Sequence, residues 1–142
     1  MNTRTLAFGI FATAVYATAA TPTFYKDVLP ILQKNCQTCH RPGEIAPFSL
    51  LSYDDAVANR QMIAEVVSNE TMPPWYAAGS HGQFQNDSSL TDEQRRALLA
   101  WVAAGGPAGN LSQAPEPPPA PDSEWRIGKP DMVISIDRKS VV

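Results

Sequence analysis

The segment NCQTCHRPG, residues 35–43, holds the side chains best suited to chemistry. Cys36 and Cys39 are three positions apart, His40 follows directly, and the chain has no other cysteine. A redox-active dithiol of this spacing usually follows a strand in a βαβ unit, and no β-branched run precedes the motif. A zinc site needs about four ligands, and beyond these three the sequence offers His81 and scattered carboxylates. Both alternatives find little support, although bare dithiol chemistry stays open.

One cofactor accounts for all three side chains. The pattern C-x-x-C-H is the attachment signature of a c-type haem. Both thiols then form thioether bonds to the porphyrin, and the adjacent imidazole is held where a ring nitrogen binds the iron. The sequence therefore predicts a single, covalently bound haem c, with Cys36 and Cys39 as the thioether residues and His40 as the proximal iron ligand.

A haem that carries electrons needs a second axial ligand, and methionine is common because its soft thioether favours Fe(II). Met72 lies in TMPPW, where two prolines exclude helix and predict a rigid, extended loop. Met62 follows a helical apolar pattern and is expected to pack in the core. His81 lies in the stretch AAGSHGQ and is the competing ligand. We expect Met72 to be the distal iron ligand, with His81 as the alternative.

One helix is predicted before the haem motif and one after it. The first begins near Phe24 and delivers Cys36, and Pro30 should bend or interrupt it. The second begins at Ser52, an N-cap candidate with acidic residues in the following turn, and runs to about Asn69.

A third helix is predicted in LTDEQRRALLAWVAAGG. Thr91 and Gln94 form a capping-box pattern at its start, and Gly105 or Gly106 ends it. One apolar stripe follows the helical period and consists of Ala97, Leu98, Trp101 and Val102. We therefore expect an all-α fold. Its core is small because it comes from about 85 to 90 residues, and we expect a large apolar cofactor to form part of this core.

The first 19 residues are typical of a signal peptide. MNTR carries one arginine, LAFGIFATAVY is an apolar run of 11 residues, and ATA at 17–19 offers a small-x-small cleavage pattern. A membrane span needs roughly 20 apolar residues, so we expect cleavage and no stable span, with an uncleaved anchor as the alternative. The remaining chain is expected to be periplasmic or secreted.

The charge balance excludes one class of partner. The chain carries 11 basic and 14 acidic side chains, and it lacks the basic clusters that nucleic-acid binding needs. Residues 20–110 hold six basic and nine acidic side chains, which disfavours a lysine ring that docks acidic partners. Arg41 and Arg60 either neutralise haem propionates or are ordinary surface charges.

The composition changes beyond Pro107. PAGNLSQAPEPPPAP holds six prolines in 15 residues, and it predicts an extended, semi-rigid linker over residues 109–124. WRIGKPDMVISIDRKSVV, residues 125–142, contains a β-prone run. We expect this run to begin a truncated second domain; a strand added to the first domain and a disordered tail are the alternatives.

Taken together, CQTCH, a proline-containing loop, MPPW and LTDEQRRALLAWVAAGGP resemble a class I cytochrome c domain. The resemblance is closest to the domains at the N-terminus of exported bacterial proteins with a copper type II, ascorbate-dependent monooxygenase-like region. It covers Phe24 to Pro107, together with WRIGKPDMVI further on. It implies a cytochrome c domain over residues 20–108, in which three main helices wrap around the haem and long Pro- and Gly-rich loops join them.

The same resemblance implies individual roles. It supports thioether bonds at both cysteines, His40 as proximal ligand and Met72 as distal ligand. It further implies that a proline carbonyl near Pro47 accepts the N–H of the histidine ring. Finally, it implies that the first helix packs against the last, with Phe24 or Tyr25 meeting Trp101.

The predicted function is electron transfer by the haem iron, as a carrier or as a redox module of a larger exported protein, and not catalysis. The expected partners are redox donor and acceptor proteins or a tethered redox domain. The alternative is catalysis or small-ligand sensing at haem, which requires an open sixth coordination position. Ligation of iron by Met72 would favour the carrier.

Overall fold

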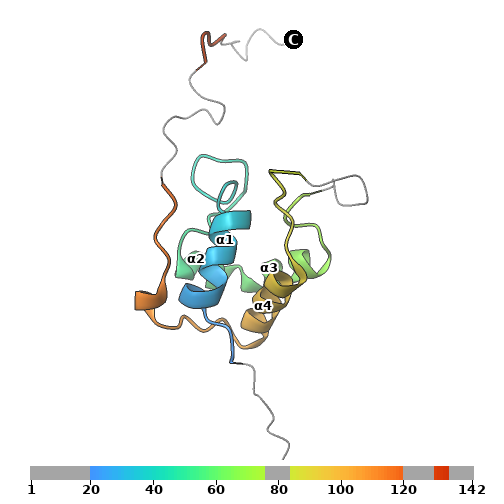
Figure 1. The fold of residues 1–142 in the computed structure, drawn as a ribbon, viewed down its shortest axis with the longest axis vertical. Helices are drawn as coiled ribbons and strands as arrows, with labels where there is room; N and C mark the ends of the chain where they lie inside the picture. Colours follow the sequence, from blue (N-terminus) through green and yellow to red (C-terminus); the bar gives the residue numbers. More distant parts are fainter. Residues whose placement is uncertain (1–19, 76–83, 120–129, 135–142) are drawn as a thin grey trace, which may run out of the picture.

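The computed structural model describes residues 20–75, 84–119 and 130–134. This part of the chain is helical and contains no strand, which confirms the all-α expectation (Figure 1). The proposed signal peptide, His81 and most of the β-prone segment lie outside the described residues. In chain order the elements are the π-helix η1 (Phe24–Val28), α1 (Leu29–Asn35), α2 (Tyr53–Ala58), α3 (Arg60–Ser68), α4 (Asp92–Ala103) and the 3₁₀-helix η2 (Leu111–Gln113).

The first helical segment changes its winding at Pro30. The wider π turn of η1 leads directly into α1, and Pro30 occupies the first turn of α1. A proline in a helix lacks a backbone N–H, and its ring collides with the carbonyl of the preceding turn. The turn before Pro30 is therefore wound as a wider π-helix instead of an α-helix. The winding changes where a bend or interruption was expected, but the helical run is continuous, and Cys36 is the C-cap of α1.

The second predicted helix is two helices. Ser52 caps α2 in a reciprocal capping box with Asp55, and α3 ends at Asn69, so both outer limits agree with the prediction. The break at Asn59 was not predicted; its φ and ψ are −100° and 7°. Its side-chain amide donates to the Asp55 carbonyl at 2.8 Å, the same carbonyl that accepts from its own backbone N–H. This local competition with the helical hydrogen bond explains the interruption.

The limits of α4 follow the predicted signals. Thr91 and Gln94 form the capping box, with hydrogen bonds of 2.9 and 3.2 Å. At the other end the N–H of Gly105 donates to Val102 and that of Gly106 to Trp101, both at 2.9 Å. This is the Schellman arrangement, and both glycines have a positive φ that side chains rarely adopt.

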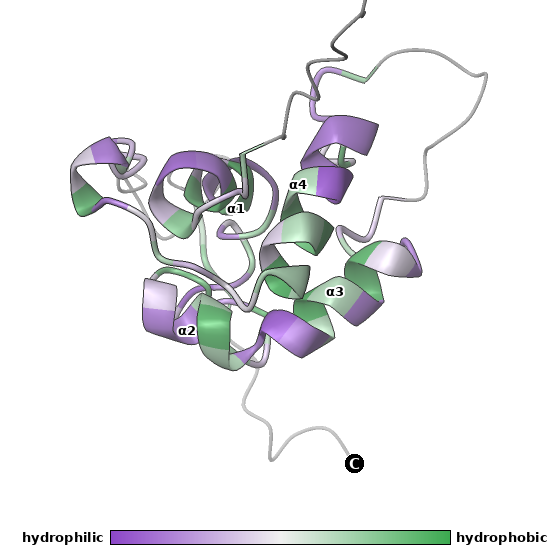
Figure 2. Ribbon diagram, turned by 90° about the horizontal axis from the view of Figure 1, so that it is seen from below, coloured by the Kyte–Doolittle hydropathy of each residue, from purple (hydrophilic) through white to green (hydrophobic). Residues whose placement is uncertain are grey.

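The core joins the beginning of the described chain to α4. Phe24 and Trp101 are fully buried, and their ring centroids lie 6.1 Å apart, which confirms the expected packing of the first helix on the last. The carbonyl of Pro107 accepts from the Phe24 backbone N–H at 2.9 Å and from the Trp101 indole at 3.0 Å. Figure 2 shows hydrophobic residues on α3 and α4 where these two helices meet.

The beginning of the proline-rich segment lies against the first helix. Ala114 packs on the core, and the Gln33 side chain donates to the Glu116 carbonyl at 3.3 Å. Figure 1 shows η2 and the chain after it beside α1. Residues 109–116, the first half of the predicted linker, therefore contact the helical unit.

Two further features concern the described part of the chain. Residues 130–134 form no strand there, and Met132 and Ile134 are exposed. None of the helices in the described ranges is long and apolar enough to cross a membrane.

Candidate functional site

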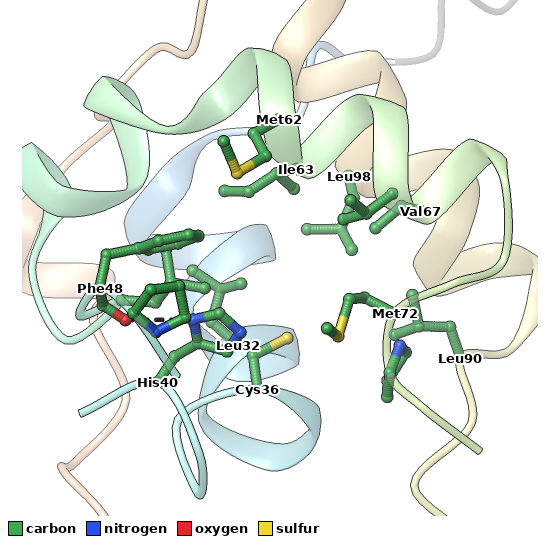
Figure 3. Close-up of a pocket in the computed structure, with 14 residues that line it drawn as sticks. Leu32, Cys36, His40, Phe48, Met62, Ile63, Val67, Met72, Leu90 and Leu98 are labelled. Atoms are coloured by element: carbon green, nitrogen blue, oxygen red, sulfur yellow. Dashed lines mark hydrogen bonds between the residues drawn. The ribbon is translucent and has the colours of Figure 1, made fainter. Parts of the chain in front are cut away.

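An apolar pocket lies where the end of α1, the loop before α2, α3 and α4 meet (Figure 3). The side chains around it come from segments far apart in the sequence and are almost all apolar. Figure 3 shows His40 and Phe48 on one side of the space and Met72 and Leu90 on the other. The lining residues are Leu32, Cys36, His40, Pro47, Phe48, Leu50, Met62, Ile63, Val66, Val67, Met72, Pro73, Leu90 and Leu98.

The imidazole of His40 is oriented by the backbone of the loop before α2. Its Nδ1 lies 3.1 Å from the carbonyl oxygen of Phe48. Because a carbonyl only accepts, Nδ1 carries the hydrogen, and in the neutral ring Nε2 keeps its lone pair. The ring of Phe48 also packs on the imidazole, with centroids 4.8 Å apart. His40 therefore lines the pocket with one nitrogen available to a metal ion.

The carbonyl that accepts from His40 differs by one residue from the expectation. Pro47 was expected near the acceptor, but the structure gives this role to Phe48, and Pro47 instead contributes to the pocket lining. The reason is the register of the loop: the backbone N–H of Leu50 donates to the His40 carbonyl at 3.0 Å, and this bond brings the Phe48 carbonyl over the imidazole.

The two cysteines differ in position. Cys36 ends α1 and lines the pocket, whereas Cys39 is half-buried one turn later and is not part of the lining. Burial raises the pKa of the Cys36 thiol to about 12, and the neighbouring Cys39 adds to the rise. Such a thiol stays protonated near neutral pH, so burial makes Cys36 itself a poor nucleophile.

Met72 lies in the pocket wall opposite His40 (Figure 3). The loop that carries it turns back on α3: the backbone N–H groups of Thr71 and Met72 donate to the Val66 carbonyl at 3.0 and 3.3 Å. Met72 is 41% exposed as a residue, and Figure 3 shows its thioether sulfur turned toward the space that it shares with His40.

Met62 was expected in the core and is instead a second thioether at the same pocket. It is 50% exposed, while its neighbour Ile63 and also Val67 are buried against α4. The helical period placed Met62 on the same side of the helix as these residues, but it lies at the edge of that side. Only the packing of α3 distinguishes the buried stripe from the pocket rim.

Neither arginine considered for haem propionates belongs to the pocket lining. The Arg41 guanidinium pairs with Glu44 at 2.9 Å, and Arg60 donates to the Val57 carbonyl at 2.8 Å. His81, the competing axial ligand, lies outside the described residues.

Sequence reasoning did not single out two residues of this site. Phe48 supplies the carbonyl for His40 and covers its ring, and Leu90 closes the pocket just before the N-cap of α4. Leu90 carries a recognisable signal, because an apolar residue directly before an N-cap often packs inward. Phe48 has no such signal, since its contribution is a backbone carbonyl.

In the described ranges, no group of three or more His, Cys, Asp or Glu side chains is placed to hold a metal ion. The four-ligand zinc alternative therefore gains no support there. Comparisons with protein-family models, curated proteins and solved structures gave no match for this chain.

Proposed function

We propose that this chain transfers electrons through one covalently bound haem c that occupies the apolar pocket. The observation that carries the proposal is that Cys36, His40 and Met72 line the same pocket although Met72 is far from the others in sequence. These are a thiol for attachment, an imidazole for one axial position and a thioether for the other. The C-x-x-C-H motif and the resemblance to class I cytochrome c domains support the same proposal.

The lining is chemically suited to an apolar group such as a porphyrin. Its walls are leucine, isoleucine, valine, phenylalanine and proline side chains, and the half-exposed Met62 and Met72 extend the apolar surface to the rim. Exposed apolar surface of this kind is costly in water and commonly marks a ligand site. A porphyrin in the pocket would cover both methionine side chains.

Each residue has one role in the proposal. Cys36 and Cys39 form the thioether bonds; Cys39 follows Cys36 in a tight turn, with its N–H 3.1 Å from the Cys36 carbonyl oxygen. His40 presents Nε2 as the proximal ligand because Phe48 holds the Nδ1 hydrogen. Met72 supplies the distal sulfur. When bound, the haem supplies an iron that alternates between Fe(III) and Fe(II).

Two filled axial positions favour a carrier over an enzyme. The pocket walls are apolar, and besides His40 and the Cys36 thiol the described lining offers no titratable side chain. We place the protein outside the cytoplasm on the basis of its N-terminal sequence. Its proposed partners are redox donor and acceptor proteins or a tethered redox domain.

A second candidate function is ligand sensing or catalysis at an open sixth position. The Met72 loop favours it, because this loop is held in part by the ion pair of Arg95 with the mostly exposed Glu70, and such a segment opens more easily than a packed helix. The two candidates differ in whether Met72 remains bound to iron in the resting protein.

The test is to export the protein together with haem-maturation machinery and to record oxidised and reduced spectra and a haem stain after denaturing electrophoresis. We expect a denaturation-resistant stain, sharp low-spin bands on reduction and a weak sulfur-to-iron charge-transfer band on oxidation. The double variant Cys36→Ala/Cys39→Ala should lose the stain. Covalent haem with a high-spin spectrum would favour the second candidate, and absence of haem from the wild-type protein would contradict the proposal.

A further inference from the structure

We propose that Gln37, between the two cysteines, is a positioning residue that holds the loop before α2 and thereby fixes the imidazole of His40. The consequence at iron rests on the proposed function, whereas the structural role does not. Gln37 is only 6% exposed, which is unusual for a glutamine. Its side-chain amide donates to the Leu50 carbonyl at 2.9 Å, and this hydrogen bond is buried.

The bond from Gln37 closes a network around His40. Leu50 accepts from Gln37 through its carbonyl and donates through its N–H to the His40 carbonyl at 3.0 Å. Two residues earlier in the same loop, the Phe48 carbonyl accepts from the His40 ring at 3.1 Å. Both ends of the short segment Phe48–Leu50 are thus hydrogen-bonded to the motif. Leu50 anchors one end, and the Phe48 carbonyl at the other end orients the imidazole.

Two backbone hydrogen bonds also anchor the loop, from the Leu50 N–H to the His40 carbonyl at 3.0 Å and from the Ala46 N–H to the Cys39 carbonyl at 3.3 Å. Neither of them reaches the Leu50 carbonyl, which accepts from Gln37. The Leu50 carbonyl is buried, so loss of the amide leaves an acceptor without water to replace the donor. The loop is then expected to shift until that carbonyl reaches solvent, and the Phe48 carbonyl moves with it.

A moved Phe48 carbonyl changes His40 as a ligand. A hydrogen bond from Nδ1–H to a carbonyl makes the opposite nitrogen a stronger donor and fixes the plane of the ring. A stronger donor stabilises Fe(III) relative to Fe(II). Weakening this bond should therefore raise the reduction potential, while the covalent attachment through the cysteines stays intact.

The experiment compares Gln37→Met with Gln33→Met in the haem-loaded protein. Methionine has a similar length and no donor. Gln33 is a matched control, because its amide also donates to a backbone carbonyl, that of Glu116, on the side of α1 away from the pocket lining. The readouts are the reduction potential and, in the diamagnetic reduced protein, the solvent exchange rate of the His40 Nδ1 hydrogen by NMR. Gln37→Met should raise both, and Gln33→Met should leave both at the wild-type values.

Gln37→Asn provides a milder variant if Gln37→Met folds poorly. It keeps the amide but shortens the side chain, and it should change both readouts in the same direction by a smaller amount. Wild-type values for both Gln37 variants, with haem attached, would overturn the inference and leave the proposed function standing. If the wild-type protein binds no haem, exchange of the Leu50 amide hydrogen in the haem-free protein still tests the role of Gln37: it should accelerate in Gln37→Met, and an unchanged rate overturns the inference.

Discussion

The two sides of the pocket are held in different ways. On the His40 side, residues 36–50, four hydrogen bonds join residues 37–40 to residues 46–50, and the bond from Gln37 is fully buried. All of these partners are close in sequence. The His40 side is therefore closed by local hydrogen bonds, and Leu50 at its end also packs in the core.

The Met72 side, residues 66–73 with Arg95, is held from two directions. The Val66 carbonyl at the end of α3 accepts from the backbone of the Met72 loop. From α4, Arg95 donates to the Val67 carbonyl at 3.3 Å and pairs with Glu70 at 2.7 Å. Glu70 is itself in a left-handed conformation, with φ of 56°, which is unfavourable for a side-chain-bearing residue. The position of Met72 therefore depends on α3 and α4 staying packed together.

This difference indicates which iron ligand is the more easily lost. On the His40 side the hydrogen bond from Gln37 to Leu50 is buried and its partners are near in sequence, whereas the Met72 side is partly exposed and includes a surface ion pair. Local opening begins where few apolar contacts and exposed hydrogen bonds occur. We expect disturbances of the fold to release Met72 before His40.

The sharpest test of the comparison is Met72→Ala. If Met72 is the distal ligand, this change opens a coordination position, converts the spectrum to high spin, allows azide or imidazole to bind and lowers the reduction potential. Met62→Ala is the matched control, since Met62 lines the same pocket and should leave the low-spin spectrum unchanged. Loss of the charge-transfer band in Met62→Ala or only in His81→Ala would show that the axial assignment is wrong.

Gly106→Ala should weaken the packing of α2 and α3 on α4, on which the Met72 side depends. Gly106 has φ of 78°, and an added Cβ would lie 2.9 Å from the Val57 side chain. We expect a loss of about 1 to 3 kcal/mol in the free energy of unfolding, measured by urea denaturation. Gly105→Ala has a similar φ but open space around its Cβ, so it should cost about 1 kcal/mol. Equal losses in the two variants would contradict the crowding at Gly106.

Arg95→Gln should act on the Met72 side alone. It removes the ion pair with Glu70 and weakens the bond to the Val67 carbonyl. Because Glu70 is mostly exposed, the free energy of unfolding should fall by only about 0.5 kcal/mol. Imidazole binding to the oxidised haem protein, followed by stopped flow, should nevertheless accelerate several-fold. The exposed neighbour Arg96 provides the control Arg96→Gln. Equal rates of imidazole binding in the two variants would show that Arg95 does not hold the Met72 loop.

The smallest effect is expected from the cap of α2, which lies outside the pocket lining. Hydrogen bonds from Ser52 and Ser49 lower the pKa of the Asp55 carboxyl below its ordinary value. A lowered pKa in the folded protein means that the ionised form is stabilised by folding. This stability is present above about pH 4 and is lost as the pH falls through the folded pKa. Asp55→Asn should reduce the acid dependence of thermal unfolding slightly, and an unchanged profile would contradict a role for the cap.

Much of the fold was predictable because its signals are local. Ser52 and Thr91 accept hydrogen bonds from residues three positions later, and Gly105 and Gly106 adopt a positive φ that other residues resist. Pro30 changes the winding of the first helical segment for a steric reason that is present in any context. The chemistry of Cys36, Cys39 and His40 is likewise readable from their types and spacing.

What the sequence by itself determined is therefore the helix limits, the helical class and the identity of the candidate ligands. Only the tertiary structure decided that Met62 lies at the rim and that Phe48 rather than Pro47 receives the His40 hydrogen. It also placed the start of the proline-rich segment against α1. These outcomes depend on which segments of the backbone and which side of a helix come into contact in the folded chain. Neither the spacing nor the type of the residues involved indicates such contacts, so they could not be predicted from the sequence.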